Sequence, residues 1–278
     1  MGGPEFAIAI IAVLLILILL SVPIVIALGS ASFFGLAYLV GSFDVAVSLL
    51  ANTAYESIRS YVFAVIPLFV LMGELISKSG AAKDLYVLIN NSLSKLPGRL
   101  SLATVFGNAV FGAVTGVSIA SAAAFSRIAY PEMVAQNYNK AVALGSIAGS
   151  ASLGMLIPPS ILLIVWGVIA EISIGKLFVA GVIPGILLAL MFGIFIVVFA
   201  IFKPKLFGES RQVQEIKHKS SRSELIGSIG VVALIFLVLG GIWFGVFTPT
   251  ESAGMGALFA LFLALLKKTS WKDIASAV

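Results

Sequence analysis

The string Gly154-Met-Leu-Ile-Pro-Pro-Ser160 interrupts a long apolar run that extends over residues 141–170. A continuous helix of that length would exceed the roughly 20 residues that cross a bilayer core. The paired prolines lack amide donors and block a continuing helix, so the run predicts one crossing made of two half-helices. In lipid, such a break is tolerated only where the opened backbone faces protein or a water-filled cavity.

The composition of the whole chain is typical of a membrane protein. Of its 278 residues, 60% are hydrophobic and only 10% are charged, whereas about a quarter of the residues in soluble domains are charged. The 27 glycines and 10 prolines suit membrane helices that pack closely or break. There is no cysteine, so disulfides and thiolate sites are excluded. We therefore predict an all-α, polytopic membrane protein.

About seven transmembrane crossings are predicted from apolar runs of bilayer length. They cover residues 6–28, 32–50, 61–77, 141–170, 177–202, 225–247 and 253–266. Pro23 is expected either to kink the first run or to mark an early turn. Residues 81–96 place Leu85 and Leu96 opposite Lys83 and Asn90, which predicts an amphipathic helix at the membrane interface.

A further apolar run over residues 99–133 is interrupted in its middle by small and polar residues. The interruption consists of Gly112, Thr115, Gly116, Ser118 and Ser121. Arg99 and Arg127 lie near the two ends, and basic residues favour one side of a membrane. Both ends are therefore expected on the same face. This pattern predicts a re-entrant helical hairpin whose tip lines a cavity.

Charged residues predict the orientation. Residues 203–224 contain six basic and three acidic residues together with the only histidine, His218, and the positive-inside rule makes this loop cytoplasmic. Counting crossings from it places the N-terminus in the periplasm and turns residues 171–175 and 248–251 outward. The basic residues are scattered at the ends of apolar runs rather than gathered on one face, which argues against nucleic-acid binding.

Two groups of polar residues are candidates for a substrate and ion site. The hairpin tip supplies Thr115, Gly116, Ser118 and Ser121, and the broken helix supplies Ser150, Ser152, Gly154, Pro158 and Pro159. Hydroxyl and opened backbone oxygens suit a hard cation such as Na⁺, and half-helix N-termini suit a carboxylate. We place Na⁺ at Thr115, Ser118 and Ser150. Glu74 is a further candidate because burying a carboxylate at membrane depth is costly.

Other functions fit these residues less well. A membrane enzyme would need a nucleophile and base, paired carboxylates or a metal site at depth, and His218 lies in the polar loop, so we predict no enzyme and no covalent cofactor. A membrane-embedded hydrolase and a structural scaffold are the alternatives from other classes. The spacing of Gly145 with Gly149, and of Gly241 with Gly245, is interpreted as close helix packing. The hydroxyls gathered at the helix breaks argue against a pure scaffold.

Five strings along the chain carry a resemblance to a known family. They are Ile66-Pro-Leu-Phe69 with Gly73-Glu74, Phe111-Gly-Ala-Val-Thr-Gly116, Tyr130-Pro-Glu-Met133, Gly154-Met-Leu-Ile-Pro-Pro-Ser160 and Phe247-Thr-Pro-Thr-Glu251. In this order they resemble the DctM-like large membrane subunit of tripartite ATP-independent periplasmic (TRAP) transporters. The resemblance implies an elevator-type membrane domain over residues 1–278. Residues 1–60 would be scaffold helices, 61–171 a first transport repeat, and 177–278 further scaffold helices with the start of a second repeat.

The resemblance also implies a function in the bacterial inner membrane. The chain would be the large subunit of a sodium-coupled transporter for small organic acids, such as C4-dicarboxylates or sialic acid. A periplasmic binding protein would deliver the acid, and a small TRAP membrane subunit would be the second partner. A stand-alone sodium/anion symporter without a binding protein is the alternative. Val117 stands where the family often has serine, so an ion-ligating hydroxyl would come instead from Thr115 or Ser118. The sequence ends at Val278 before a second, inverted half, so we expect no transport by this chain alone.

Overall fold

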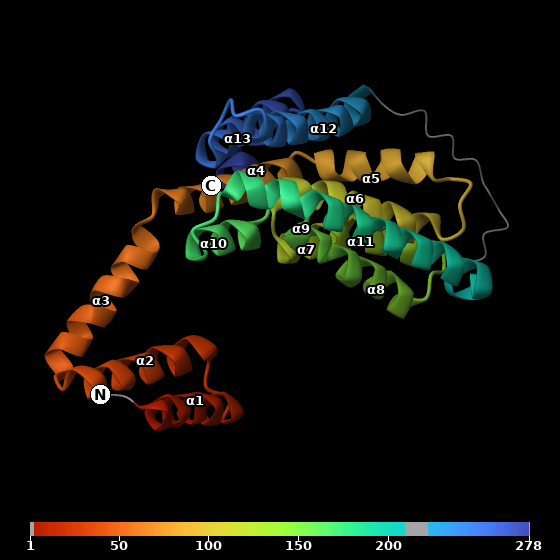
Figure 1. Cartoon of the computed structure of the whole chain (residues 1–278). Coiled ribbons are helices and arrows are strands. Elements are labelled where there is room, and N and C mark those ends of the chain that lie inside the picture. The colour runs from red at the N-terminus through yellow and green to blue at the C-terminus, as the bar shows by residue number, and fades with distance from the viewer. Residues whose placement is uncertain (1–2, 209–221, 278) are drawn as a thin grey trace. The chain divides into compact units, whose positions relative to one another are not determined.

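A computed structural model describes residues 3–208 and 222–277. Within these ranges the regular secondary structure consists of helices (Figure 1). Five helical segments there are long and apolar enough to cross a membrane: Tyr61–Lys78, Lys140–Ile169, Ile174–Phe202, Arg222–Trp243 and Pro249–Leu266. The predicted helical membrane protein is confirmed, whereas seven crossings and an elevator architecture stay predictions. Most of the loop predicted to be cytoplasmic, including His218, lies outside the described residues.

The chain forms two compact units, Met1–Tyr61 and Val62–Val278. In the first unit, α1 (Pro4–Leu19) packs on α2 (Ile24–Val40), which is followed by α3 (Phe43–Arg59). The ring of Phe6 stacks on that of Tyr38 with centroids 4.6 Å apart. Gly35 faces Ile10, so the two helices run antiparallel. The division of the chain into scaffold and transport repeats stays a prediction.

The bounds predicted for the first two crossings are wrong, because two turns divide this region into three helices. Ser21 adopts a positive φ of 61°, and Pro23 is the N-cap of α2, so the early-turn interpretation of Pro23 is the correct one. Gly41, with a φ of 72°, ends α2, and the Ser42 hydroxyl accepts a hydrogen bond from the Val45 amide at the start of α3.

The second unit begins within η1 (Tyr61–Ala64), which is followed by α4 (Val65–Lys78) and α5 (Ala81–Ser92). The prediction for residues 81–96 is correct in its amphipathic character but wrong in two details. The side chain of Asn90 is buried against the protein and not turned outward. Leu96 lies beyond the end of the helix and is exposed.

Residues 99–135 form a helical hairpin around a tight turn. The helix α6 (Arg99–Thr115) is joined to α7 (Ser118–Ala135) by Gly116 and Val117. The helices run antiparallel, because at the open end the Arg99 guanidinium donates to Gln136 Oε1 at 3.2 Å. Nearly all side chains of α6 are buried. This helix is central in the unit, since α4, α5, α7, α8 and α11 all pack against it.

The predicted broken helix is present at the predicted place. It consists of α8 (Lys140–Ala151), the short α9 (Leu153–Leu156) and α10 (Ile161–Ile169), followed by α11 (Ile174–Phe202). The break packs against two glycines of α11. A Cβ on Gly181 would lie 2.8 Å from the Leu156 carbonyl oxygen, and one on Gly185 would lie 2.6 Å from Ile157 Cγ1. These glycines therefore make room for the break.

The remaining elements are η2 (Pro204–Leu206), α12 (Arg222–Trp243), α13 (Pro249–Leu266) and α14 (Trp271–Ala275). The helix α13 packs on α4, and α12 packs on α5 and α13 (Figure 1). Thr248 and Glu251 form a capping box, in which the Glu251 carboxylate accepts from the Thr248 amide at 2.8 Å. The string Thr248-Pro-Thr-Glu251 therefore starts a helix.

Close helix packing at the two predicted glycine pairs is not what the described residues show. A Cβ added to Gly145 would meet no atom within 4 Å, and one on Gly149 would only touch Phe192 at 3.6 Å. Gly245 has a φ of 70° and lies in the turn after α12. Gly241 packs against the nearby Phe247 ring. Spacing alone therefore did not identify the glycines at helix contacts.

Candidate functional site

The helices α6 and α8–α9 run side by side in the same direction and share a polar stripe. The contacts, in order along both helices, join Ser101 to Ser146, Asn108 to Ser150 and Gly112 to Gly154. The Ser146 hydroxyl donates to the Ser101 hydroxyl at 3.0 Å, and Asn108 Nδ2 donates to Ser150 Oγ at 2.7 Å. The stripe leads from the open end of the hairpin toward its tip.

Near the tip the two helices approach to backbone contact. A Cβ added to Gly112 would lie only 2.6 Å from Gly154 Cα, and one on Gly154 would lie 3.2 Å from Ser121 Oγ. The three elements α6, α7 and α9 therefore meet at these two glycines. A side chain at Gly112 would have to separate two backbones.

The turn of the hairpin is seated in the break of the broken helix. The Ile161 amide at the start of α10 donates to the Gly116 carbonyl oxygen at 3.2 Å. Gly116 has a φ of 64°, and a Cβ there would lie 2.6 Å from the Pro159 carbonyl oxygen. Pro158 and Pro159 are buried and joined by a cis peptide bond. The predicted hairpin tip and the predicted break thus form one structural unit.

Two hydroxyls of the predicted site come together at this unit. Thr115 Oγ1 lies 3.4 Å from Ser121 Oγ, and both residues are buried. The Val117 amide donates to Thr115 Oγ1 at 3.5 Å. Ser118 is half-buried, and its hydroxyl makes no hydrogen bond within residues 3–208 and 222–277. On the other side, a Cβ on Gly73 of α4 would lie 2.6 Å from Thr115 Cγ2, so Thr115 packs between α4 and α7.

Ser150 lies at a different level of the stripe. Its hydroxyl accepts from Asn108 and donates to the Ser146 carbonyl oxygen at 2.6 Å. Asn108 and Thr115 are seven residues apart on α6, which is about 10 Å along a helix. Ligand oxygens of one hard cation each lie within about 2.6 Å of it. A single ion therefore cannot bind both Thr115 and Ser150.

No hydrogen bond or ion pair among the described residues joins two other predicted residues to the tip. Ser152 is exposed, and its hydroxyl donates to the Gly149 carbonyl oxygen of its own helix at 2.7 Å. Glu74 follows Gly73 on α4 and is half-buried, with no ion pair to another described residue. Glu74 adjoins Gly73, which packs against Thr115 of the tip, and its role stays a prediction.

Asn108 is a candidate that is absent from the residues predicted by sequence. It is fully buried, and its Oδ1 has no hydrogen-bond partner in the described part of the chain. An amide within an apolar run was the available signal, because polar groups at membrane depth are costly and usually functional. Because its Oδ1 lone pairs are free within the described residues, Asn108 can supply an oxygen ligand to a cation beside Ser150.

The hairpin tip offers Na⁺ uncharged oxygen ligands. Among the described residues there is no group of three or more Asp, Glu, His or Cys that could hold a metal ion. Two oxygens 3.4 Å apart, as in Thr115 and Ser121, can both lie about 2.4 Å from one hard cation. Na⁺ bound there would supply positive charge that attracts a carboxylate, while the hydroxyls of Thr115 and Ser121 would hold the ion.

A hairpin tip seated in a broken helix, lined by hydroxyls and built into an apolar helical unit, is typical of secondary transporters. The comparison of the sequence with protein families agrees with that class. The chain belongs to the family described as "Tripartite ATP-independent periplasmic transporter, DctM component", which matches residues 11–278.

Individual relatives come from several bacteria. The C4-dicarboxylate TRAP transporter large permease protein DctM of Pseudomonas aeruginosa is 37% identical over 79% of this chain and 50% of its own length. That of Vibrio cholerae is 33% identical over 93% of this chain and 56% of its own. The sialic acid TRAP transporter large permease protein SiaM of Vibrio cholerae is 30% identical over 84% of this chain and 54% of its own.

The chain spans about half the length of the curated relatives that it matches. These relatives are transporter permeases and not enzymes, as the sequence predicted. Their substrates differ by name, and the site residues described above include no feature that separates a dicarboxylate from a sialic acid.

Proposed function

We propose that the chain is the large transmembrane subunit of a sodium-coupled transporter that imports small organic acids across the bacterial inner membrane. A periplasmic binding protein delivers the acid, and a small membrane subunit completes the complex. The observation that carries this proposal is the seating of the hairpin tip in the helix break, through the Ile161 to Gly116 hydrogen bond. It gathers opened backbone and hydroxyls at one buried place.

Sodium coupling rests on the chemistry of this place. Thr115 and Ser121 offer oxygens without a formal negative charge, so Na⁺ binding leaves net positive charge next to the site. The N-terminal ends of α7 and α10 add partial positive charge through their helix dipoles. A carboxylate bound beside them therefore gains from the ion, and the ion gains from the carboxylate, which is the physical basis of symport.

A stand-alone sodium/anion symporter is the second candidate. The hairpin and the break would serve it equally well, because they recognise the ion and the carboxylate and not the delivering protein. The names of the relatives favour the tripartite arrangement. Uptake by the complete permease in proteoliposomes separates the two, since it requires the binding protein only in the first case.

We expect Thr115→Ala and Ser118→Ala to raise the Na⁺ concentration for half-maximal uptake, because each removes an oxygen from the tip. The loss of one hydroxyl contact is worth about 1 kcal/mol, which corresponds to roughly a fivefold shift per residue. The measurement is Na⁺-dependent uptake by a full-length permease that carries this sequence, with the small subunit and the binding protein supplied.

Ser152→Ala is the matched control for this experiment. The Ser152 hydroxyl is exposed and bonded only to its own helix, so its loss should leave the Na⁺ dependence unchanged. An unchanged Na⁺ dependence in both tip variants would assign Thr115 and Ser118 to helix packing. Uptake by the unmodified complex that ignores the Na⁺ gradient would refute sodium coupling itself.

The proposed orientation is testable because the chain has no cysteine. We expect a cysteine at Ser94 to react with an impermeant thiol reagent only from the cytoplasm, and one at Ser173 only from the periplasm. Both serines are exposed. Lys95 and Arg99 follow Ser94, so the positive-inside rule places Ser94 in the cytoplasm, and Ser173 lies beyond the predicted crossing of residues 141–170, on the opposite side. Labelling of Ser94→Cys by the impermeant reagent in intact cells would contradict the proposed orientation.

A further inference from the structure

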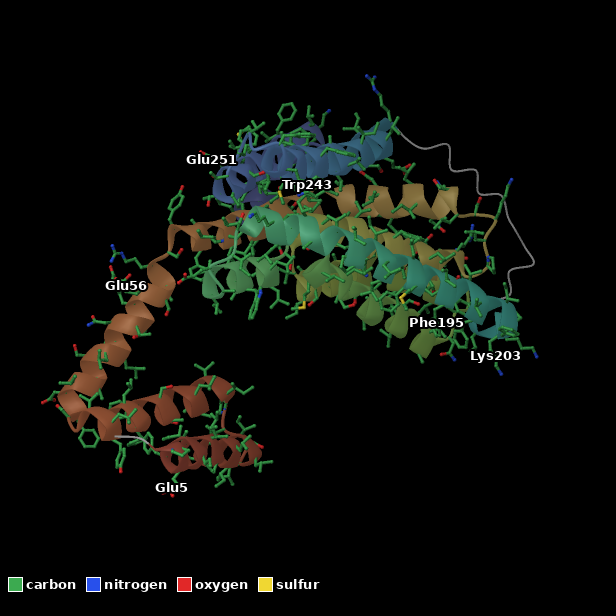
Figure 2. All side chains as sticks on the ribbon, in the orientation of Figure 1. Glu5, Glu56, Phe195, Lys203, Trp243 and Glu251 are labelled. Atoms are coloured by element: carbon green, nitrogen blue, oxygen red, sulfur yellow. The ribbon has the colours of Figure 1, made fainter. Side chains whose placement is uncertain are left out.

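A cavity of about 440 Å³ lies between α8 and α11. Both helices pack on α6, which contributes Val105 to the floor. Phe192, Phe195 and Phe199 line the α11 wall, and Figure 2 labels Phe195 on this helix. Gly145 lines the α8 wall, and a Cβ there would meet no atom within 4 Å. The cavity is therefore a mostly apolar groove of ligand size, to which Ser146 and Ser150 contribute polar lining on the α8 side.

The surface around the groove is apolar. Leu144 of α8 is 51% exposed, and Phe195 and Phe202 of α11 are 63% and 76% exposed. Side chains of this kind face hydrocarbon when the helices lie in a bilayer. A ligand that enters the groove sideways therefore comes from the lipid phase and must itself carry a hydrocarbon chain.

One end of the groove is basic. Asn139 and Leu206 line it there, and the Asn139 amide donates to the Leu206 carbonyl oxygen at 2.9 Å. Lys140 and Lys205 are the sequence neighbours of this bonded pair, and both are exposed. Lys203 lies two residues from Lys205, at the end of α11 (Figure 2).

Within residues 3–208 and 222–277, no ion pair joins these lysines to a carboxylate. Residues 133–143 and 196–208 contain the three lysines and no Asp or Glu, and Glu209 lies outside the described residues. The preceding carboxylate in the sequence is that of Glu132, which lies close enough to Arg99 and Lys83 to interact with them electrostatically. The lysines at the groove are therefore available for an anion from outside the chain.

We propose that this groove binds one anionic phospholipid. An acyl chain lies between α8 and α11 along Gly145 and Phe195, and the phosphate headgroup lies against Lys140 and Lys205. Basic pockets between membrane helices bind anionic headgroups in this way. The bound lipid fills the space between α8 and α11, so it supports the part of α8 that carries Ser146 and Ser150.

The test uses the purified chain in nanodiscs with a phosphatidylglycerol that carries a photoreactive group on one acyl chain. Phosphatidylcholine with the same chains is the neutral comparison. We expect phosphatidylglycerol to label peptides covering residues 139–150 and 192–207 in preference to phosphatidylcholine. Lys140→Gln and Lys205→Gln should each lower this preference about fivefold. Lys176→Gln, at the exposed opposite end of α11, is the matched control and should not change it.

A second pair of variants tests the groove itself. Gly145→Leu fills the space and should remove the labelling by both lipids, whereas Gly145→Ala should retain it. Equal labelling by both lipids in the unmodified chain would overturn the proposal. So would absent labelling of these peptides by either lipid, or an equal loss of the preference in Lys176→Gln. None of these readouts depends on transport, so their outcome is independent of whether the proposed symport is correct.

Discussion

Replacing Asp84 with Asn is expected to lower the free energy of unfolding by about 3–5 kcal/mol. The Asp84 carboxylate on α5 pairs with the Lys267 ammonium at the end of α13. The two side chains are only 13% and 8% exposed. Removal of the carboxylate leaves a buried ammonium without its counter-charge, and that penalty is larger than the value of the pair itself.

The pair also joins two helix ends of favourable polarity. Asp84 lies in the first turn of α5, and Lys267 is the C-cap of α13, so each charge opposes the partial charge of its own helix end. A Cβ on Gly227 of α12 would collide with the Asp84 carboxylate. The pair is thus enclosed where α5, α12 and α13 meet.

Unfolding of the purified chain in mixed micelles measures this prediction. Lys268→Gln is the matched control, because Lys268 is the exposed neighbour of Lys267 and its change should stay within about 0.5 kcal/mol. The double variant Asp84→Leu with Lys267→Met should recover much of the loss, since it removes both charges. A loss in Asp84→Asn no larger than that in Lys268→Gln would contradict a buried pair.

The second large effect is expected at Gly112→Ala, which should lower the free energy of unfolding by about 3 kcal/mol. The added methyl group would lie 2.6 Å from Gly154 Cα and 3.0 Å from the Gly154 amide nitrogen. Because these are backbone atoms, no rotamer change relieves the contact. The helices α6 and α9 must separate, which pulls the hairpin tip out of the helix break.

Gly145→Ala is the matched control, since its methyl group meets no atom within 4 Å. Both variants exchange glycine for alanine within a helix, so the gain in helix propensity is shared. Unfolding of the chain and Na⁺-dependent uptake by the full-length complex are the two measurements. Equal stability of the two variants would mean that the close approach of Gly112 and Gly154 does not hold the site together.

Much of the second unit could be predicted because its boundaries depend on local chemistry. The pair Pro158-Pro159 ends a helix in any surroundings, and Gly116 permits the left-handed turn that reverses the hairpin. The first two crossings were predicted less well. Hydropathy does not distinguish a continuous helix from two helices with a turn at Ser21 or Gly41, because the residues around these turns are equally apolar.

The candidate site was predicted in its parts and not in its connections. The tip and the break were each visible from small polar residues, but the pairing of Thr115 with Ser121, and the separation of both from Ser150, required the packing of α6, α7 and α8. Asn108 and the glycines Gly181 and Gly185 were missed. Their roles come from neighbours distant in the sequence, which spacing along one helix does not encode.

The sequence by itself determined that this protein is a helical membrane protein of the DctM family, where one helix breaks and where one hairpin turns. These features follow from apolar run length and from proline and glycine, whose effects act within a few residues. Only the tertiary structure decided that the turn sits in the break, that Asp84 meets Lys267, and that a groove opens beside Gly145. Each of these depends on the distance between helices, which is set by side-chain volumes on both partners together.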